Sequence, residues 1–546
     1  MTSSRLARLS ILGLAAVLSA CGGSGASAPA PSGPGPISVE TLCALDQPYR
    51  LGDLDLQTAT VLDLQQALAR GTLTSEALVT RQLALIEAYD RRGPALNSVR
   101  VLAPDALQQA RAADARRRAG RARGPLDGLT VLLKDNIGTT DLPTTAGSIA
   151  LAGNIPRREA TITRRLREAG VIVLGKANLS EFANWVSRMM PNGYSSLGGQ
   201  VLAPYGADLD PLGSSTGSSV AATMGFATLT VGSETSGSII APSSVQSAVG
   251  VKPTLGLVSR VGIIPLAPSF DTAGPITRTV TDAAALLQVL AYADPEDPLA
   301  ARFTAALEGQ APDYLAALST DALRGVRLGV RVVDLDPSLF GGPLFEQALE
   351  VLRQQGAEIV PIDDPALAAE RASLSTLGAI FNEFKFSLNR YLATEAGPGL
   401  PVSDLTDIVL FNQQNPDTVK YGQELLIASD AQTGLEIDPV YLASREATIA
   451  TQQLALDRLL DSQDVDALVS WYFGWSNVGQ TAAAGYPNVT VPLGYLDDHE
   501  PVGLEFAGRP FSEDRLLAYA YAYEQASRRR VPALTMNPAL RAACGR

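Results

Sequence analysis

The sequence predicts an α/β fold, and two observations support this class. Apolar runs typical of strands alternate with runs whose apolar residues recur at helical spacing. Hydrophobic residues make up 46% of the 546 residues and charged residues only 18%, a composition typical of a protein with a large buried core. We therefore expect one extended sheet covered by helices rather than a chain of small modules.

The elements of the first half follow from capping residues and from apolar runs. Thr60 is expected to cap a helix that begins at Val61, and Thr74 or Ser75 should cap a second one. After these scaffold helices, strands and helices are expected to alternate. These segments are 129–133, 161–169, 171–174, 219–227 and 229–231.

The second half continues the same alternation. No linker and no repeat interrupts it, so a single domain over residues 45–546 is the simplest organisation, with room for a helical insertion between about 365 and 460. Strands are expected at 326–333, 358–362, 467–471, 488–493 and 503–506, and helices at 344–355, 381–393 and 512–527.

The first twenty residues are typical of an export signal. Arg5 and Arg8 precede the apolar run 9–20, which is too short to span a bilayer but fits a secretory leader. Leu-Ser-Ala-Cys at 18–21 resembles the lipobox of bacterial lipoproteins, in which the cysteine, here Cys21, becomes lipidated. The alternative is a disordered tail.

Export would make the mature chain a cell-envelope lipoprotein with a possible lipid anchor, or a secreted or periplasmic protein. Residues 21–44, rich in Gly, Ser, Ala and Pro, would be a tether after the leader. The two remaining cysteines, Cys43 and Cys544, lie near opposite ends of the mature chain. They can pair in an oxidising compartment or remain thiols, and the sequence favours neither outcome.

Charge and composition exclude several classes of function. The net charge of −13 argues against nucleic-acid binding, which normally needs a basic surface. The only histidine, His499, lies in a turn-like acidic segment, so neither a zinc site nor a Ser-His-Asp triad is expected. No glycine-rich phosphate cradle is present. We expect no metal and no other cofactor.

Two loops rich in serine and glycine, 213–219 and 232–238, flank an apolar helix and a short strand. Such loops are often only flexible surface segments. They also suit a hydrolase, which needs an exposed hydroxyl and bare backbone amides near the substrate carbonyl. Ser238 precedes the apolar residues 239–241, and a serine at the start of a helix lies where the helix dipole favours negative charge.

With histidine excluded, Lys134 is the best candidate for the base. It ends the apolar strand 129–133, and burial can lower the pKa of a lysine until its amine is neutral and can accept a proton. The alternative is a strand-end lysine that reaches solvent, and its spacing alone would favour that interpretation.

Several motifs in order resemble the amidase signature family over nearly the whole mature chain. The resemblance implies an α/β/α fold in which helices cover both faces of a large, twisted, mixed central sheet. It also implies hydrolysis of linear amide bonds. The matching segments are 128–136, 175–182, the two serine-rich loops, 250–256, 271–275 and 485–492.

The resemblance assigns a Ser-Ser-Lys triad. Ser238 would be the nucleophile, Ser214 the bridging serine after a cis peptide bond, and Lys134 the base. Ser215 would support the site with its hydroxyl. The oxyanion hole would be formed by the backbone amides of Thr235, Ser236, Gly237 and Ser238.

The sequence departs from the family pattern in three places. Ser236 stands where a glycine is common, Ile240 replaces an arginine, and 216–219 is less glycine-rich. The loss of the arginine argues against substrates held there by an acidic group. Residues 198–200 and 258–265 most resemble bacterial peptide amidases, which deaminate C-terminal carboxamides.

The sequence therefore predicts an exported amidase that hydrolyses a small or peptide amide through an acyl-enzyme on Ser238. One alternative is the glutaminase subunit of a tRNA-dependent amidotransferase, which export, acidity and Ile240 oppose. Another is an inactive lipoprotein that binds amides or peptides, which the intact triad opposes.

Overall fold

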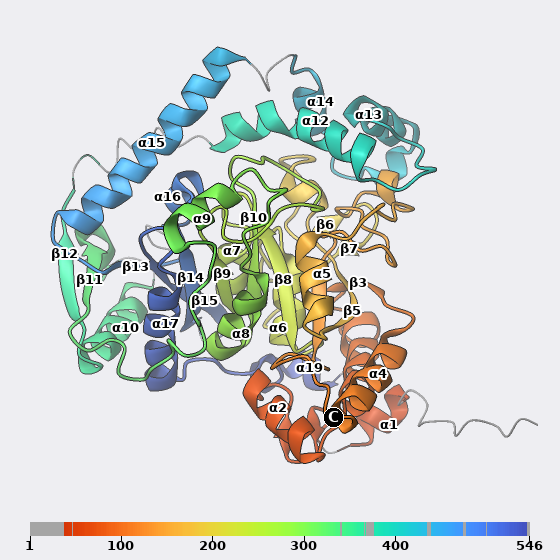
Figure 1. The fold of residues 1–546 in the computed structure, drawn as a ribbon, viewed down its shortest axis with the longest axis horizontal. Helices are drawn as coiled ribbons and strands as arrows, with labels where there is room; N and C mark the ends of the chain where they lie inside the picture. The colour runs from red at the N-terminus through yellow and green to blue at the C-terminus, as the bar shows by residue number, and fades with distance from the viewer. Residues whose placement is uncertain are drawn as a thin grey trace, which may run out of the picture. The chain divides into compact units, whose positions relative to one another are not determined.

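An 11-stranded mixed sheet forms the centre of the fold (Figure 1). The computed structural model describes residues 38–542, apart from 46, 339–340, 365, 367–375, 434–437, 473–476 and 498. The expected leader, Cys21, most of the expected tether and Cys544 lie outside these residues. All described residues belong to one compact unit, 37–546.

The strands of the sheet follow the order β12-β11-β13-β15-β14-β9-β10-β8-β4-β5-β3. Strands β8, β4 and β5 are parallel, whereas β10 is antiparallel to β8 and to β9. The bounds are β3 (Val99–Leu102), β4 (Thr130–Lys134), β5 (Ile172–Ala177), β8 (Leu229–Glu234), β9 (Val249–Lys252), β10 (Thr272–Thr277), β11 (Arg327–Arg331), β12 (Glu358–Ile362), β13 (Ala467–Trp471), β14 (Asn488–Leu496) and β15 (Glu500–Ala507).

Helices cover the sheet and surround its ends (Figure 1). Two short hairpins, β1 (Arg50–Leu51) with β2 (Leu54–Asp55) and β6 (Tyr194–Ser195) with β7 (Gly199–Gln200), lie outside it. The helices are α1 (Val39–Cys43), α2 (Val61–Arg70), α3 (Ser75–Leu85), α4 (Ala106–Arg118), α5 (Thr161–Glu168), α6 (Thr216–Thr223), α7 (Ile240–Ser244), α8 (Val280–Leu290), α9 (Ala300–Leu307), α10 (Gly342–Gln354), α12 (Thr376–Thr394), α13 (Leu405–Gln414), α14 (Glu424–Asp430), α15 (Pro439–Asp461), α16 (Val478–Ala484), α17 (Glu513–Ser527), α18 (Ala533–Met536) and α19 (Pro538–Ala542).

The predicted α/β/α architecture with a large mixed sheet is confirmed. Helices α8 and α17 pack against each other and against strands β10 and β14. Helices α6 and α7 pack against strands β8 and β14. Glycines in the strands allow α7 to approach closely: a Cβ on Gly250 would lie 2.5 Å from the hydroxyl oxygen of Ser243. This close packing fixes the two short helices that follow the serine-rich loops.

Local signals explain several helix starts. The Thr60 hydroxyl accepts a hydrogen bond from the Asp63 amide, and the Asp63 side chain bonds back to the Thr60 amide, which forms a capping box. Thr74 caps α3 through the Ala77 amide. Both expected caps are therefore present.

One predicted strand is shorter than expected, and several elements were not expected. The strand predicted at 326–333 ends at Arg331, and Val332–Leu335 forms a 3-10 turn. The sequence did not indicate β3, β9, β10 or α8. Cys43 is disulfide-bonded.

Helices α12–α15 lie together along one side of the molecule in Figure 1. They fall in the part of the sequence, between about 365 and 460, in which a helical insertion was expected. Helices α12–α14 share a hydrophobic cluster with residues 146–186 and 264–270, in which Phe384 of α12 meets Phe182 edge-on at 5.6 Å between ring centroids. Across the described part of the chain, no helix is both long and apolar enough to span a membrane.

Candidate active site

The candidate base and the loop of the candidate nucleophile lie at the same edge of the sheet. Lys134 ends β4, and Ser233 and Glu234 end the neighbouring parallel strand β8. The Lys134 ammonium group donates hydrogen bonds to the Ser214 hydroxyl at 2.7 Å and to the Ser233 carbonyl at 3.0 Å. The two serine-rich loops therefore meet at the end of β4.

Lys134 is fully buried. Burial lowers its pKa from 10.5 to about 7, while the nearby carboxylates of Asp271 and Glu234 act in the opposite direction and raise it. About half of the Lys134 amines are therefore neutral near pH 7, and a neutral amine can accept a proton. The alternative of a strand-end lysine in solvent is wrong for this residue.

Ser214 and Ser215 are held immediately before α6. The Gly213–Ser214 peptide bond is cis, as the family resemblance implied. The Ser215 hydroxyl donates to the Ser233 carbonyl at 2.9 Å and accepts from the Ser233 amide at 3.2 Å. Ser215 thus fixes the first loop to the end of β8, next to the Lys134 contact.

Ser238 lies in the turn between β8 and α7, and only 8% of it is exposed. Its carbonyl accepts a hydrogen bond from the Ser215 amide at 3.2 Å, so the two loops are joined through their backbones. The Glu234 carboxylate accepts from the amides of Ile239 at 2.8 Å and Ile240 at 3.1 Å. These contacts set the turn that carries the Ser238 hydroxyl.

The structure brings the Lys134 and Ser214 side chains into direct contact and brings Ser238 beside them through the backbone. Within the described residues, the Ser238 hydroxyl makes no hydrogen bond to Ser214 in this state. Catalytic hydrogen bonds are often longer before substrate binds. A hydrogen bond between the Ser238 and Ser214 hydroxyls would complete the predicted chain of three groups.

Four consecutive amides in the turn are open for hydrogen bonding. Between residues 38 and 542, leaving aside the undescribed gaps, the N–H groups of Thr235, Ser236, Gly237 and Ser238 have no acceptor in the protein. Gly237 has φ of +95°, a left-handed conformation that glycine adopts without strain. Such a run of amides suits a developing oxyanion.

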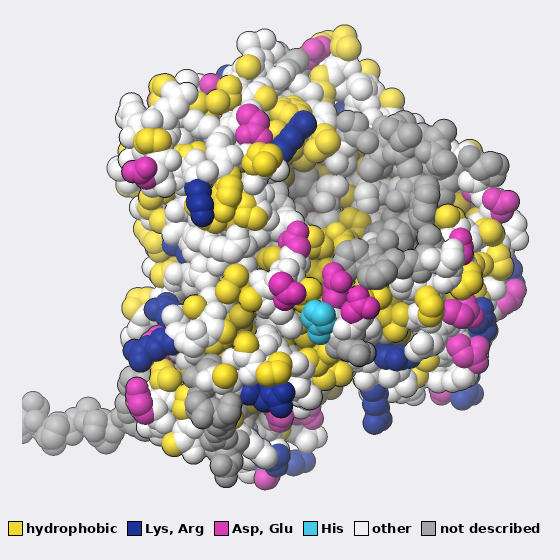
Figure 2. All heavy atoms as spheres, turned by 180° about the vertical axis from the view of Figure 1, so that it is seen from behind, with side chains coloured by type: hydrophobic (Ala, Val, Ile, Leu, Met, Phe, Trp, Pro, Cys, Tyr) yellow, Lys and Arg dark blue, Asp and Glu magenta, His cyan; other side chains and the backbone are white. Residues whose placement is uncertain are grey.

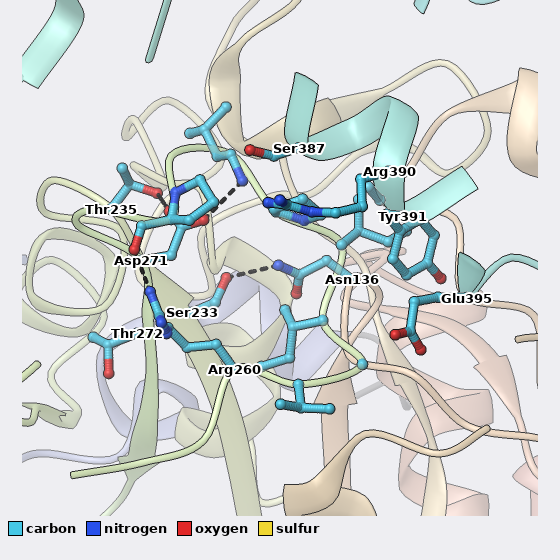
Figure 3. Close-up of a pocket in the computed structure, with 18 of the residues that line it drawn as sticks. Asn136, Ser233, Thr235, Arg260, Asp271, Thr272, Ser387, Arg390, Tyr391 and Glu395 are labelled. Carbon is cyan, nitrogen blue, oxygen red and sulfur yellow. Dashed lines mark hydrogen bonds between the residues drawn. The ribbon is translucent and has the colours of Figure 1, made fainter. Parts of the chain in front are cut away.

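A pocket of about 360 Å³ opens beside this turn (Figure 3). Ser233, Glu234 and Thr235 are among the residues that line it. Residues 260–266 form one wall, so the segment that resembles peptide amidases borders the pocket. Figure 3 shows Ser387, Arg390 and Tyr391 of α12, and Glu395 directly after it, across the pocket from Thr235 and Asp271.

The sequence did not indicate the roles of three polar residues around the turn. The Asn136 amide donates to the Ser233 hydroxyl at 2.9 Å, and the Thr235 hydroxyl donates to the Asp271 carboxylate at 2.5 Å. Glu234 holds the helix that follows Ser238. All three lie in or next to the motifs of the family, but only the folded chain shows what they touch.

Two other expectations concern His499 and the arginine replaced by Ile240. His499 is exposed, and Figure 2 shows the only histidine of the chain at the surface. The Ile240 side chain is fully buried. No group of three or more potential metal ligands occurs in the residues that the structure describes.

Comparison with known proteins decides the family. A family model for amidases matches residues 82–517. The chain belongs to the amidase family. A probable amidase from Arabidopsis thaliana is 36% identical to it over 87% of this chain and 91% of that protein.

A solved structure of peptide amidase from Stenotrophomonas maltophilia is similar to this amidase over 87% of this chain and 98% of that one, with 42% identity and a TM-score of 0.82. A subunit of the glutamyl-tRNA(Gln) amidotransferase of Myxococcus xanthus is 34% identical over 86% of this chain and 98% of the relative. This amidase is therefore an enzyme that hydrolyses carbon–nitrogen bonds of amides.

Proposed function

We propose that the protein is an exported amidase that converts a carboxamide into a carboxylate and ammonia or an amine, through an acyl-enzyme on Ser238. One observation carries the catalytic part of this proposal. A buried lysine whose pKa lies near 7 contacts the Ser214 hydroxyl directly, and the Ser214–Ser215 loop is bonded to Ser238.

In the proposed acylation, neutral Lys134 takes the proton of the Ser214 hydroxyl while Ser214 takes the proton of Ser238. The Ser238 oxygen attacks the carbonyl carbon, and the resulting oxyanion accepts hydrogen bonds from the open amides of residues 235–238. Protonated Lys134 then returns its proton through Ser214 to the leaving nitrogen, and the C–N bond breaks. Water repeats the sequence on the ester and releases the acid.

The similarity to a peptide amidase, together with the wall at 260–266, supports a C-terminal carboxamide as the substrate group. Ammonia, the leaving group of such a substrate, is too small to need a pocket. The pocket beside the turn would therefore hold the acyl side of the substrate.

Export rests on the leader and is supported by the disulfide at Cys43, because disulfides persist in oxidising compartments. Full-length protein expressed in a bacterium should partition with membranes after lipidation at Cys21. Cys21→Ala should release it into the soluble envelope fraction. Recovery of the wild-type protein from the cytosol would contradict the proposal.

The glutaminase component of a tRNA-dependent amidotransferase is the second candidate, favoured by 34% identity to such a protein from Myxococcus xanthus. The leader, the acidic chain and the buried Ile240 oppose this function. An inactive amide-binding lipoprotein is opposed by the intact Lys134–Ser214 contact.

Ammonia release from simple amides, peptide amides and esters tests the proposed function. The purified enzyme should release ammonia from at least one carboxamide without any partner protein. Ser238→Ala should abolish this release and retain the wild-type circular dichroism spectrum. Wild-type rates in the Ser238→Ala protein would contradict the assignment, and activity that depends on partner proteins would favour the amidotransferase.

A further inference from the structure

Helix α12 forms the side of the pocket that faces the oxyanion turn (Figure 3). Its first residue, Thr376, has its hydroxyl 3.4 Å from that of Ser236 in the turn. Further along, Ser387 and Tyr391 line the pocket. A shift of α12 would therefore change the distance across the pocket.

Two of the polar side chains of α12 that line the pocket make hydrogen bonds within the protein. The Ser387 hydroxyl donates to the Glu383 carbonyl at 2.7 Å, and the Tyr391 hydroxyl accepts from the Asn154 amide at 3.1 Å. The opposite wall is largely apolar and includes Ile263, Ile264, Pro265 and Leu266. Charged residues also line the pocket, but Arg158 pairs with Glu296 and Glu395, and Arg260 pairs with Asp297. Because these charges are paired within the protein, the apolar wall suits an apolar group rather than a charged one.

Glu383 fixes α12 from behind the pocket. Its buried carboxylate accepts hydrogen bonds from the Ser269 amide at 2.9 Å and the Ser269 hydroxyl at 2.6 Å. The Tyr441 hydroxyl of α15 donates to it at 2.6 Å, and Arg445 lies 3.4 Å away. One carboxylate thus joins α12, α15 and the loop that contains Ser269.

The same loop is tied to the oxyanion turn at its other end. The Asp271 carboxylate accepts from the amides of Leu266 at 2.8 Å and Ala267 at 3.0 Å, and from the Thr235 hydroxyl. Two carboxylates therefore hold this loop, one to the turn and one to α12. Hydrogen bonds to buried carboxylates are strong enough to set such spacing.

We propose that Glu383 is a positioning residue that holds α12 over the pocket and thereby makes the enzyme selective for amides with a large apolar acyl group. This inference rests on the proposed function of the same site. Glu383 itself touches neither Ser238 nor the open amides, so it acts through α12 and the 266–271 loop.

Glu383→Gln tests the proposal, because glutamine keeps the size of the side chain but loses the charge. The KM for N-acetyl-phenylalanine amide should rise about tenfold or more, as expected when charged hydrogen bonds are lost. The kcat/KM for acetamide, whose acyl group does not reach α12, should stay within about twofold. The pH midpoint of kcat/KM should not move, because Lys134 is untouched.

Asp114→Asn is the matched control, since buried Asp114 holds another helix start, accepting from the amides of Ser75 and Glu76. In this variant, the ratio of kcat/KM for N-acetyl-phenylalanine amide to kcat/KM for acetamide should stay unchanged. Tyr441→Phe removes a single donor and provides a milder second variant if Glu383→Gln does not fold; it should raise the same KM by a smaller factor.

The role of Glu383 would be overturned if kcat/KM fell equally for both substrates in Glu383→Gln. It would also be overturned if the ratio of kcat/KM between the two substrates stayed unchanged in both Glu383→Gln and Tyr441→Phe, or changed by the same factor in Asp114→Asn. These results are distinct from failure of the proposed function. That failure would appear as unchanged activity in Ser238→Ala.

Discussion

The pH dependence of kcat/KM gives a quantitative prediction, because the proposed base works only when it is neutral. Burial lowers the pKa of Lys134 to about 7, so its neutral fraction should be about 1% at pH 5, about half at pH 7 and about 99% at pH 9. The rate should rise roughly tenfold per pH unit below pH 6 and level off above pH 8. A lysine with its ordinary pKa of 10.5 would still give a rising rate at pH 9.

The assay is initial ammonia release from N-acetyl-phenylalanine amide at substrate concentrations well below KM, with protein stability checked at each pH. Asp271→Asn tests the direction of the pKa shift. Because the Asp271 charge raises the pKa of Lys134, its removal should move the pH midpoint of kcat/KM to lower pH. A flat profile from pH 5 to 9, or one that still rises tenfold per unit above pH 9, would refute the role of Lys134.

Two further variants test the bridge and the scaffold separately. Ser214→Ala should lower kcat/KM by about 10²- to 10⁴-fold, the range for loss of proton transfer, with an unchanged melting temperature; near-wild-type kinetics would remove Ser214 from the mechanism. Thr60→Ala deletes the cap of α2 and should lower the free energy of unfolding by about 1 kcal/mol without affecting kcat/KM, as measured by thermal melting and ammonia release. An unchanged melting curve would show that the capping box contributes nothing.

The strands that carry the site could be predicted because their sequences are locally consistent with their places in the sheet. The run before Lys134 is buried over its whole length and mostly apolar, which is typical of a parallel strand covered on both faces. By contrast, β10 contains Gly274 and Pro275, which disfavour a central strand. Its pairing with β8 and β9 depends on tertiary packing, so local pattern gave no signal.

The candidate site was only partly predictable for a similar reason. Residue chemistry indicated Ser238 and Lys134, and the family resemblance added Ser214, which contacts Lys134 from 80 positions away in the chain. The carboxylates that hold the loops could not be found in this way. Glu383 meets Ser269 across 114 positions, and no local pattern distinguishes it from other acidic residues on helices.

Reaction with a fluorophosphonate, which modifies activated serine hydroxyls, tests the central claim most directly. The enzyme should gain the mass of one phosphonyl group, peptide mapping should place that group on Ser238, and Lys134→Met should react at least about a hundredfold more slowly. Modification at another serine, or equal labelling rates in the two proteins, would contradict the account.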